Sequence, residues 1–171
     1  MVVLDPDAPE MTRLLLSFVL AAAFAAVASG CAEPPGLSPE QVALFEQPVD
    51  AELVVGAEKN AMRYSTTRVE APAGATVRLV MDNATTTSPA MIHNVVVVRD
   101  QAAVERVGLA AATVPDNIPD DGAILFYTPL TRPGQRAAVV FTMPPPGEYP
   151  FLCTFPGHWA TMQGTLVSTA P

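Results

Sequence analysis

Histidine and cysteine are scarce in this chain of 171 residues, which contains two of each. Two histidines exclude an enzyme built on several histidine-rich metal centres, because each such centre needs imidazoles of its own. Two cysteines permit one disulfide at most. Both cysteines have other assignments, given below, so we expect no disulfide.

Charged residues are also sparse, at 15% of the chain, and acidic residues outnumber basic ones by 17 to 9. Nucleic-acid-binding proteins present a basic patch, so this balance gives no support for a nucleic-acid partner. It permits docking to a basic protein, because complementary charge raises the rate and the specificity of encounter. The acids are scattered along the chain, so the sequence defines no docking face by charge.

The longest apolar run, residues 14–27, is shorter than the roughly 20 residues of a membrane-spanning helix and follows Arg13, which is typical of a secretory signal. Residues 27–31, VASGC, resemble a bacterial lipoprotein box with Cys31 as the lipidated residue, although Ala28 replaces the usual leucine. Lipidation would anchor the mature protein to the membrane, outside the cytoplasm, in the periplasm or at the cell surface. The alternative is ordinary signal cleavage, which leaves Cys31 as a free or paired thiol.

The composition divides the chain into three parts. Residues 1–31 form the leader, residues 32–48 a tether rich in proline, and residues 49–171 one domain of ordinary size. Within the tether, Ser38 and Pro39 favour the cap and the first position of a short helix. The first ten residues contain three acids and no base, which is unusual for a signal. A start at Met11 instead of Met1 is therefore one hypothesis for the precursor.

The domain has the sequence pattern of a β-protein. Residues 75–82 alternate between apolar and polar, and the β-branched run 95–98 is typical of a strand buried on both faces. Segments rich in proline and glycine separate the other expected strands, which lie at 52–56, 64–70, 136–142, 148–153 and 164–168. Seven or eight short strands favour an all-β sandwich or barrel. Residues 101–112 instead have helix-forming composition and predict a helix in the connection 100–122.

The strongest functional signal is the run CTFPGHWATM, which holds Cys153, His158 and Met162. A thiolate, an imidazole and a thioether at this spacing can all point into one loop between two strands. Two histidines, one cysteine and a distant axial methionine are the ligand set of an electron-transfer copper site. The second histidine would be His93, the other one in the chain. The alternative is that Cys153 and Met162 are ordinary core residues.

CTFPGH, followed by x3-Met and QGTL, resembles the ligand loop of azurin and auracyanin, which are small blue copper proteins, or cupredoxins. The upstream segment MIHNVVVV is similar to the family's His-Asn segment, in which the first copper histidine begins a strand. The likeness covers residues 50–170. It implies a Greek-key β-sandwich of seven or eight strands that binds one copper ion through His93, Cys153, His158 and Met162.

The resemblance also implies roles for neighbours of these ligands. Asn94 would bridge the two ligand loops by hydrogen bonds, and its alternative role is that of a turn residue at the start of a strand. The amide of Phe155 would donate toward the Cys153 sulfur, and Thr154 would help to hold the loop. Ile92 stands where azurin has a glycine whose carbonyl contacts copper at long distance, so this contact stays open.

In the family, the histidine that corresponds to His158 emerges through an apolar patch that serves as the electron port. Residues near it in this sequence would form the rim of that patch: Met91, Phe155, Pro156 and Trp159. An exposed apolar rim of this kind suits docking of a partner protein. The alternative for Trp159 is that it packs against the predicted helix 101–112.

The leading interpretation is a monomeric one-electron carrier between redox proteins, such as cytochromes, oxidases or photosynthetic and respiratory complexes. No catalytic residue is expected, since four protein ligands leave no open position for a substrate. Copper nitrite reductases and multicopper oxidases need further histidines, and the binuclear copper centre of oxidase subunits needs two cysteines in the loop. A copper delivery or storage protein is the alternative function, although such carriers favour exposed sulfur ligands.

Overall fold

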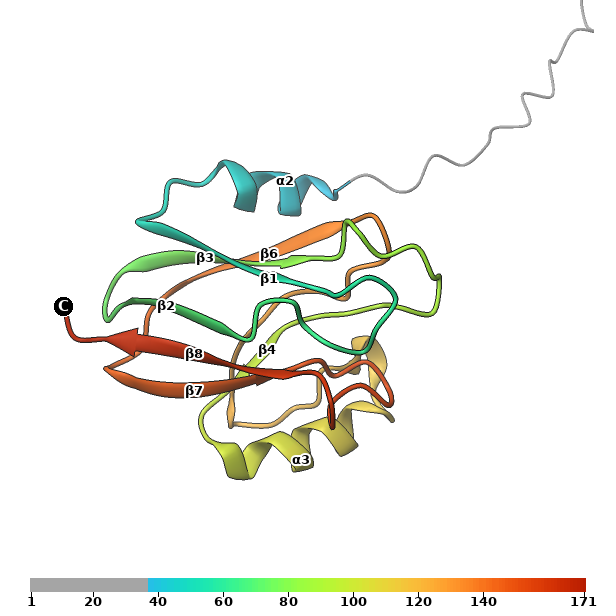
Figure 1. The fold of residues 1–171 in the computed structure, drawn as a ribbon. Coiled ribbons are helices and arrows are strands. Elements are labelled where there is room, and N and C mark those ends of the chain that lie inside the picture. Colours follow the sequence, from blue (N-terminus) through green and yellow to red (C-terminus); the bar gives the residue numbers. More distant parts are fainter. Residues whose placement is uncertain (1–36) are drawn as a thin grey trace, which may run out of the picture. The chain divides into compact units, whose positions relative to one another are not determined.

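The computed structural model describes residues 37–171, so the predicted leader and its Cys31 lie outside the described part. Eight strands within residues 37–171 form two sheets that pack face to face (Figure 1). The three-stranded sheet has the order β1-β3-β6 (Ala51–Gly56, Thr76–Asp82 and Arg136–Thr142). The five-stranded sheet has the order β2-β8-β7-β4-β5 (Arg68–Pro72, Gln163–Thr169, Gly147–Leu152, Val96–Val98 and Ile124–Tyr127). The predicted all-β sandwich is confirmed.

Most of the connections cross from one sheet to the other, and this crossing explains the pairing of the strands. β1 and β3 belong to one sheet with β2 of the other sheet between them in sequence, and they pair in parallel. β2 and β8 also pair in parallel. The other pairs in both sheets are antiparallel, including β7 with β8, whose connecting loop holds the CTFPGHWATM run.

The main core lies between the sheets and receives alternate residues of their strands. β1 contributes Leu53 and Val55, and β3 contributes Val77, Leu79 and Met81. Cys153 and Met162 belong to this same core. Two of the predicted copper ligands are therefore continuous with the apolar interior of the sandwich.

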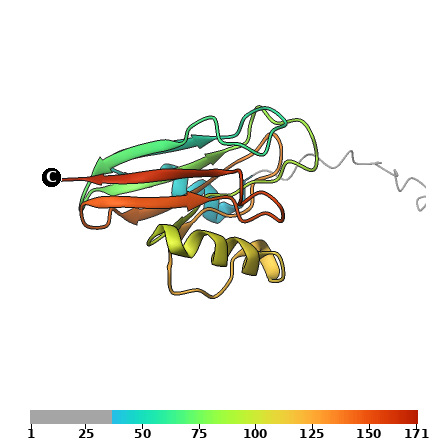
Figure 2. The ribbon, with the colours of Figure 1, turned by 60° about the horizontal axis from the view of Figure 1, so that its bottom comes forward.

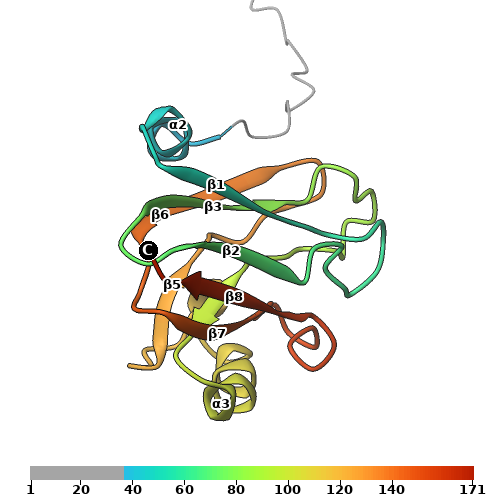
Figure 3. The ribbon, with the colours of Figure 1, turned by 60° about the vertical axis from the view of Figure 1, so that its left-hand side comes forward.

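The β-branched run 95–98 is buried on both sides, as its sequence predicts, because a helix covers one face of β4. Val95 and Val97 face the core between the sheets, whereas Val96 and Val98 pack against α3 (Gln101–Ala111). Asp100 caps this helix by accepting a hydrogen bond from the amide of Ala103 at 3.1 Å. Figures 2 and 3 show α3 lying along the outer side of the five-stranded sheet. The predicted helix is confirmed, one residue shorter than expected.

A second helix, α2 (Pro39–Glu46), occupies part of the segment expected to be a tether, with Ser38 as its cap. The Arg78 guanidinium of β3 donates to the carbonyl oxygens of Leu44, at 2.7 Å, and Gln47. The side-chain amide of Gln41 exchanges two hydrogen bonds with the backbone of Ala138 on β6. These contacts fix α2 against the three-stranded sheet, opposite α3 in the views of Figures 1 and 3.

The remaining differences from the expected strands are local. β2 begins at Arg68 instead of residue 64, because Tyr64 makes an isolated bridge to Ala57 in the preceding loop. β5, which pairs with β4, was missed because the segment ILFY does not alternate between apolar and polar. Neither α2 nor α3 has the length that a membrane-crossing helix requires, with 8 and 11 residues.

Candidate metal centre

The chain brings its two histidines and Cys153 together at one end of the sandwich. Cys153 directly follows β7, and Met162 directly precedes β8, so a strand pair fixes both ends of the loop that also carries His158. The amide of Cys153 donates to the Met162 carbonyl at 3.0 Å, and the amide of Met162 donates to the His158 carbonyl at 2.9 Å. His93 lies ahead of β4 and is held in an isolated bridge to Thr131.

The donor atoms of these side chains converge on one point. The Cys153 Sγ lies 3.9 Å from the His93 Nδ1 and 3.7 Å from the His158 Nδ1, and the two Nδ1 atoms are 3.2 Å apart. Donor atoms that share one ion through bonds of about 2.0–2.3 Å have separations of this size. The fourth predicted ligand, Met162, is fully buried in the core beside Cys153. The donor set therefore fits a single metal ion.

Burial has opposite effects on the thiol and on the imidazoles. It raises the pKa of Cys153 to about 11, although the backbone amides of Asn94 and Phe155 act against this rise. It lowers the pKa of His93 to about 4, assisted by the nearby His158, whose own pKa is also lowered by burial. Both imidazoles are thus neutral at neutral pH, the form that binds metals, and a cation is needed to stabilise the thiolate.

Asn94 joins the two ligand-bearing segments. Its Nδ2 donates to the Thr154 Oγ1 at 2.8 Å, and its Oδ1 accepts from the Thr154 amide at 2.9 Å. Its own carbonyl accepts a hydrogen bond from the Tyr64 hydroxyl at 2.5 Å. Hydrogen bonds therefore join Asn94, the residue that follows His93, to Thr154, the residue that follows Cys153. Sequence reasoning missed Tyr64, a buried tyrosine in a loop with no metal-ligand spacing to reveal it.

The predicted rim of the site is partly exposed. Pro156 is exposed, Met91 and Phe155 are half-buried, and the Phe155 ring lies 5.0 Å from the His158 ring. Trp159 is half-buried and packs on α3, where a Cβ added to Gly108 would lie 2.4 Å from its Cγ. Met62, which sequence reasoning missed, is 45% exposed, and its carbonyl accepts from the hydroxyl of Thr161 in the ligand loop.

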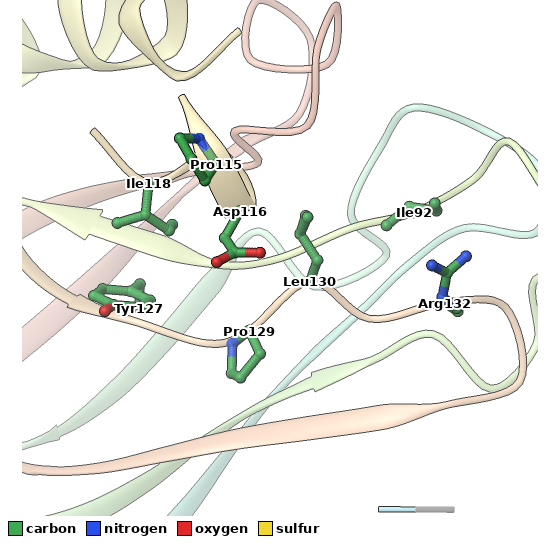
Figure 4. Close-up of a pocket in the computed structure, with 8 residues that line it drawn as sticks. All are labelled: Ile92, Pro115, Asp116, Ile118, Tyr127, Pro129, Leu130 and Arg132. Atoms are coloured by element: carbon green, nitrogen blue, oxygen red, sulfur yellow. The ribbon is translucent and has the colours of Figure 1, made fainter. Parts of the chain in front are cut away.

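A cavity of about 560 Å³ lies beside this centre but is separate from it. Figure 4 shows it between the short helix η1 (Pro115–Asn117) and the segment 129–132, with Ile92 at its edge. None of the four predicted copper ligands lines the cavity. The Ile92 side chain is one of its lining groups.

The family model of copper-binding proteins of the plastocyanin/azurin family matches residues 51–168, which include all four predicted ligands. The chain belongs to this family. His93, Cys153, His158 and Met162 are positioned as the type 1 copper site that characterises such cupredoxins. Copper is therefore the cofactor.

Proteins similar to this chain include auracyanins, azurins and an outer membrane protein. Auracyanin-A of Chloroflexus aurantiacus is 30% identical over 118 residues, which are 66% of this chain and 71% of the relative. The solved structure of auracyanin B superposes with a TM-score of 0.65 at 32% identity, covering 72% of this chain and 91% of that one. Outer membrane protein H.8 of Neisseria meningitidis is 38% identical over 82 residues, which are 44% of each chain. The chain spans about half or less of some relatives, so the likeness concerns this domain.

Proposed function

We propose that this cupredoxin is a one-electron carrier that passes electrons between redox proteins and has no substrate turnover of its own. The observation that carries the proposal is the closed character of the site. His93, Cys153 and Met162 are fully buried, and His158 is only 4% exposed. Bound copper supplies a Cu(II)/Cu(I) couple, and four protein ligands leave no position for a substrate.

The residues around the ligands favour fast electron transfer because they resist movement. The Asn94–Thr154 pair and the backbone hydrogen bond between Cys153 and Met162 hold the ligand loops in one arrangement. A ligand set that moves little when the oxidation state changes has a small reorganisation energy. Apolar burial of Cys153 and Met162 in the core excludes water from the same region.

His158 is the proposed route for the electron, since it is the one ligand of the four with any solvent-accessible surface, at 4% exposed. The exposed Pro156 and the half-buried Phe155 in the same loop, together with the half-buried Met91 two residues before His93, are the proposed apolar docking surface. The exposed Met62 side chain extends this surface. Trp159 contributes less to it, because its side chain packs on α3. Small apolar surfaces of this kind suit brief encounters with partner proteins.

We infer an extracytoplasmic location for the protein, anchored by lipid on Cys31. The apolar run 14–27 and the sequence VASGC support this inference. The name of the related outer membrane protein H.8 is consistent with a cell-envelope protein. Labelling of cells with a radioactive or alkyne-bearing fatty acid tests the anchor. Wild-type protein should be labelled, Cys31→Ser should not, and a labelled serine variant would contradict the assignment.

Copper loading tests the site. Copper(II)-loaded protein should be intensely blue because a Cys153 thiolate binds the metal, and Cys153→Ser should lose the colour. A blue serine variant would disprove the thiolate ligand. Stopped-flow mixing with a c-type cytochrome then tests the function, and reduction and reoxidation of bound copper should be fast.

Copper delivery is the competing function, and the same preparation distinguishes it. A delivery protein would transfer its copper readily to a chelator or to an apo-protein of moderate affinity. Burial of the sulfur ligands Cys153 and Met162 opposes such exchange. Retention of copper through repeated redox cycles is the result expected of a carrier, and ready loss of copper would favour delivery.

A further inference from the structure

Within residues 37–171, no group accepts from the second ring nitrogen of His93, the nitrogen through which a metal-binding histidine is usually oriented. A ligating histidine commonly donates its second ring nitrogen to a carboxylate, a carbonyl or water, which fixes the ring. The His93 Nε2 is buried and has no hydrogen-bond partner among residues 37–171, while its Nδ1 faces Cys153 and His158. The position of the ring therefore depends on the groups packed around it and on the backbone that carries it.

That backbone is held by Thr131. The His93 amide donates to the Thr131 carbonyl at 3.1 Å, and the Thr131 amide donates to the His93 carbonyl at 2.7 Å. Both Thr131 and His93 lie outside the named strands, and the pairing of β4 with β5 supports the bridge between them from one side only, where the Thr128 amide donates to the Val95 carbonyl at 3.0 Å. A pair of hydrogen bonds at the end of a ladder opens easily unless another group secures its free side.

Asn83 is that group. It follows β3, is fully buried, and directs its Nδ2 to the carbonyl oxygens of Met91 and Thr131, each at 2.9 Å. One contact fixes the chain two residues before His93, and the other fixes Thr131, the residue that pairs with His93. Asn83 is itself anchored, because its amide donates to the Gln135 carbonyl and its carbonyl accepts from the Gly134 amide, both at 3.0 Å.

We propose that Asn83 is the positioning residue for His93, and that its side-chain amide sets the place of this ligand in the copper site. Asn94 secures the Cys153 side of the centre, and Asn83 secures the His93 side. The Oδ1 of Asn83 is buried and has no partner in the described part of the chain, 37–171, while the amide nitrogen makes both contacts. The inference rests on copper binding by His93.

The test replaces the amide donor with groups that cannot make both contacts. Asn83→Leu keeps a side chain of similar shape without any donor, and Asn83→Ser is the milder change. Both should weaken copper binding by about 10–100-fold, the usual effect of losing a partner that orients a ligand. Both should also alter the thiolate absorption band and the hyperfine splitting in the electron spin resonance spectrum. Competition with a copper chelator measures the affinity.

Amide hydrogen exchange of the reduced, copper(I)-loaded protein gives a local readout. The His93 amide should exchange about tenfold faster in the variants, because Thr131, which accepts its hydrogen bond, is no longer secured. The amide of Cys153, bonded to Met162 in the other loop, should exchange as in the wild type. Equal acceleration of both amides would show a general loss of stability and would overturn the proposal.

Asn60→Gly is the matched control. Asn60 lies in an exposed loop with a positive φ of 55°, and its side chain bonds Thr87 and Ser88, in the segment that leads to Met91. Glycine keeps this backbone conformation and removes the side-chain contacts. The control should retain the wild-type spectrum and copper affinity. An Asn60→Gly variant as perturbed as Asn83→Leu would contradict a specific role for Asn83.

Three further outcomes would reject the proposal. One is a wild-type spectrum and affinity in both Asn83 variants, with only a lower melting temperature. Another is failure of both variants to fold, because Asn83 would then serve the whole domain. The third is absence of a thiolate band in wild-type protein, which would refute the copper site itself. Slow reaction of a copper-loaded wild type with cytochromes would refute electron transfer alone and leave the role of Asn83 intact.

Discussion

Gly108 is a mid-helix glycine whose replacement tests the packing of α3 against the copper-site loop. A Cβ at this position would lie 2.4–2.7 Å from three atoms of Trp159, namely Cγ, Cβ and Cδ2. These atoms are close to the Trp159 backbone, so they cannot move aside without moving the chain next to His158. Gly108→Ala therefore forces either α3 or the ligand loop to shift.

Two effects oppose each other in Gly108→Ala, and their sizes determine the sign. Alanine is favoured over glycine inside a helix by about 1 kcal/mol. Overpacking of a well-filled core costs about 1–3 kcal/mol and occasionally more. Contacts under 3.0 Å with an inflexible part of a side chain place this site toward the upper end of that range. We expect a net destabilisation of about 1–2 kcal/mol, or a melting temperature lower by about 3–8 °C.

Thermal and denaturant unfolding of the copper-loaded protein measures this change, and Gly122→Ala is the control. Gly122 has open space within 4 Å of an added Cβ and has no positive φ, so its replacement should alter stability by less than about 0.5 kcal/mol. The Gly108 variant should also shift the visible spectrum, since the loop carries His158. A Gly108→Ala protein more stable than the wild type, with an unchanged spectrum, would refute the packing argument.

Three further results are expected. Asn94→Ala should destabilise the protein by about 2–4 kcal/mol in denaturant unfolding, because it leaves two buried groups of Thr154 unpaired. An effect below about 0.5 kcal/mol would contradict the role of the Asn94–Thr154 hydrogen bonds. Met162→Leu should retain copper and raise the reduction potential in voltammetry, since it removes an axial donor that stabilises Cu(II); a lower potential would contradict that role. In copper-free protein, burial of the neutral His93 imidazole makes the free energy of unfolding depend on pH. Its contribution should be fully present above pH 6.5, the pKa of histidine in the unfolded chain, and should be lost as the pH falls toward 4. The raised pKa of Cys153 should produce a second loss of stability from about pH 9 toward pH 11, and a flat unfolding profile across both ranges would refute these shifts.

The ligand loop and the central strands could be predicted from the sequence because their signals are local. The Cys-x4-His-x3-Met spacing lies within ten residues, and one strand pair closes the loop. The run 95–98 indicated burial on both faces, and the structure shows α3 as the second cover. Such signals come from residues that are neighbours in the sequence, so they can be recognised without a structure.

The parts that could not be predicted depend on partners distant in sequence. Asn83 lies ten residues before His93 in a polar segment, and its role appears only when Thr131 is brought beside it, 48 residues away. The docking of α2 likewise requires Arg78 and Ala138, neither of which has a recognisable pairing signal. Ser38 and Pro39 indicated where a helix begins but not that it would pack on a sheet.

The docked α2 also limits how far the copper domain could reach from a membrane. With Cys31 as the lipid anchor, only residues 32–38 separate the acylated end from the first turn of the helix. Seven residues extend to about 25 Å at most. A carrier with so short a linker would stay in a thin layer next to the bilayer. Diffusion along the membrane surface would then bring it to its electron donors and acceptors.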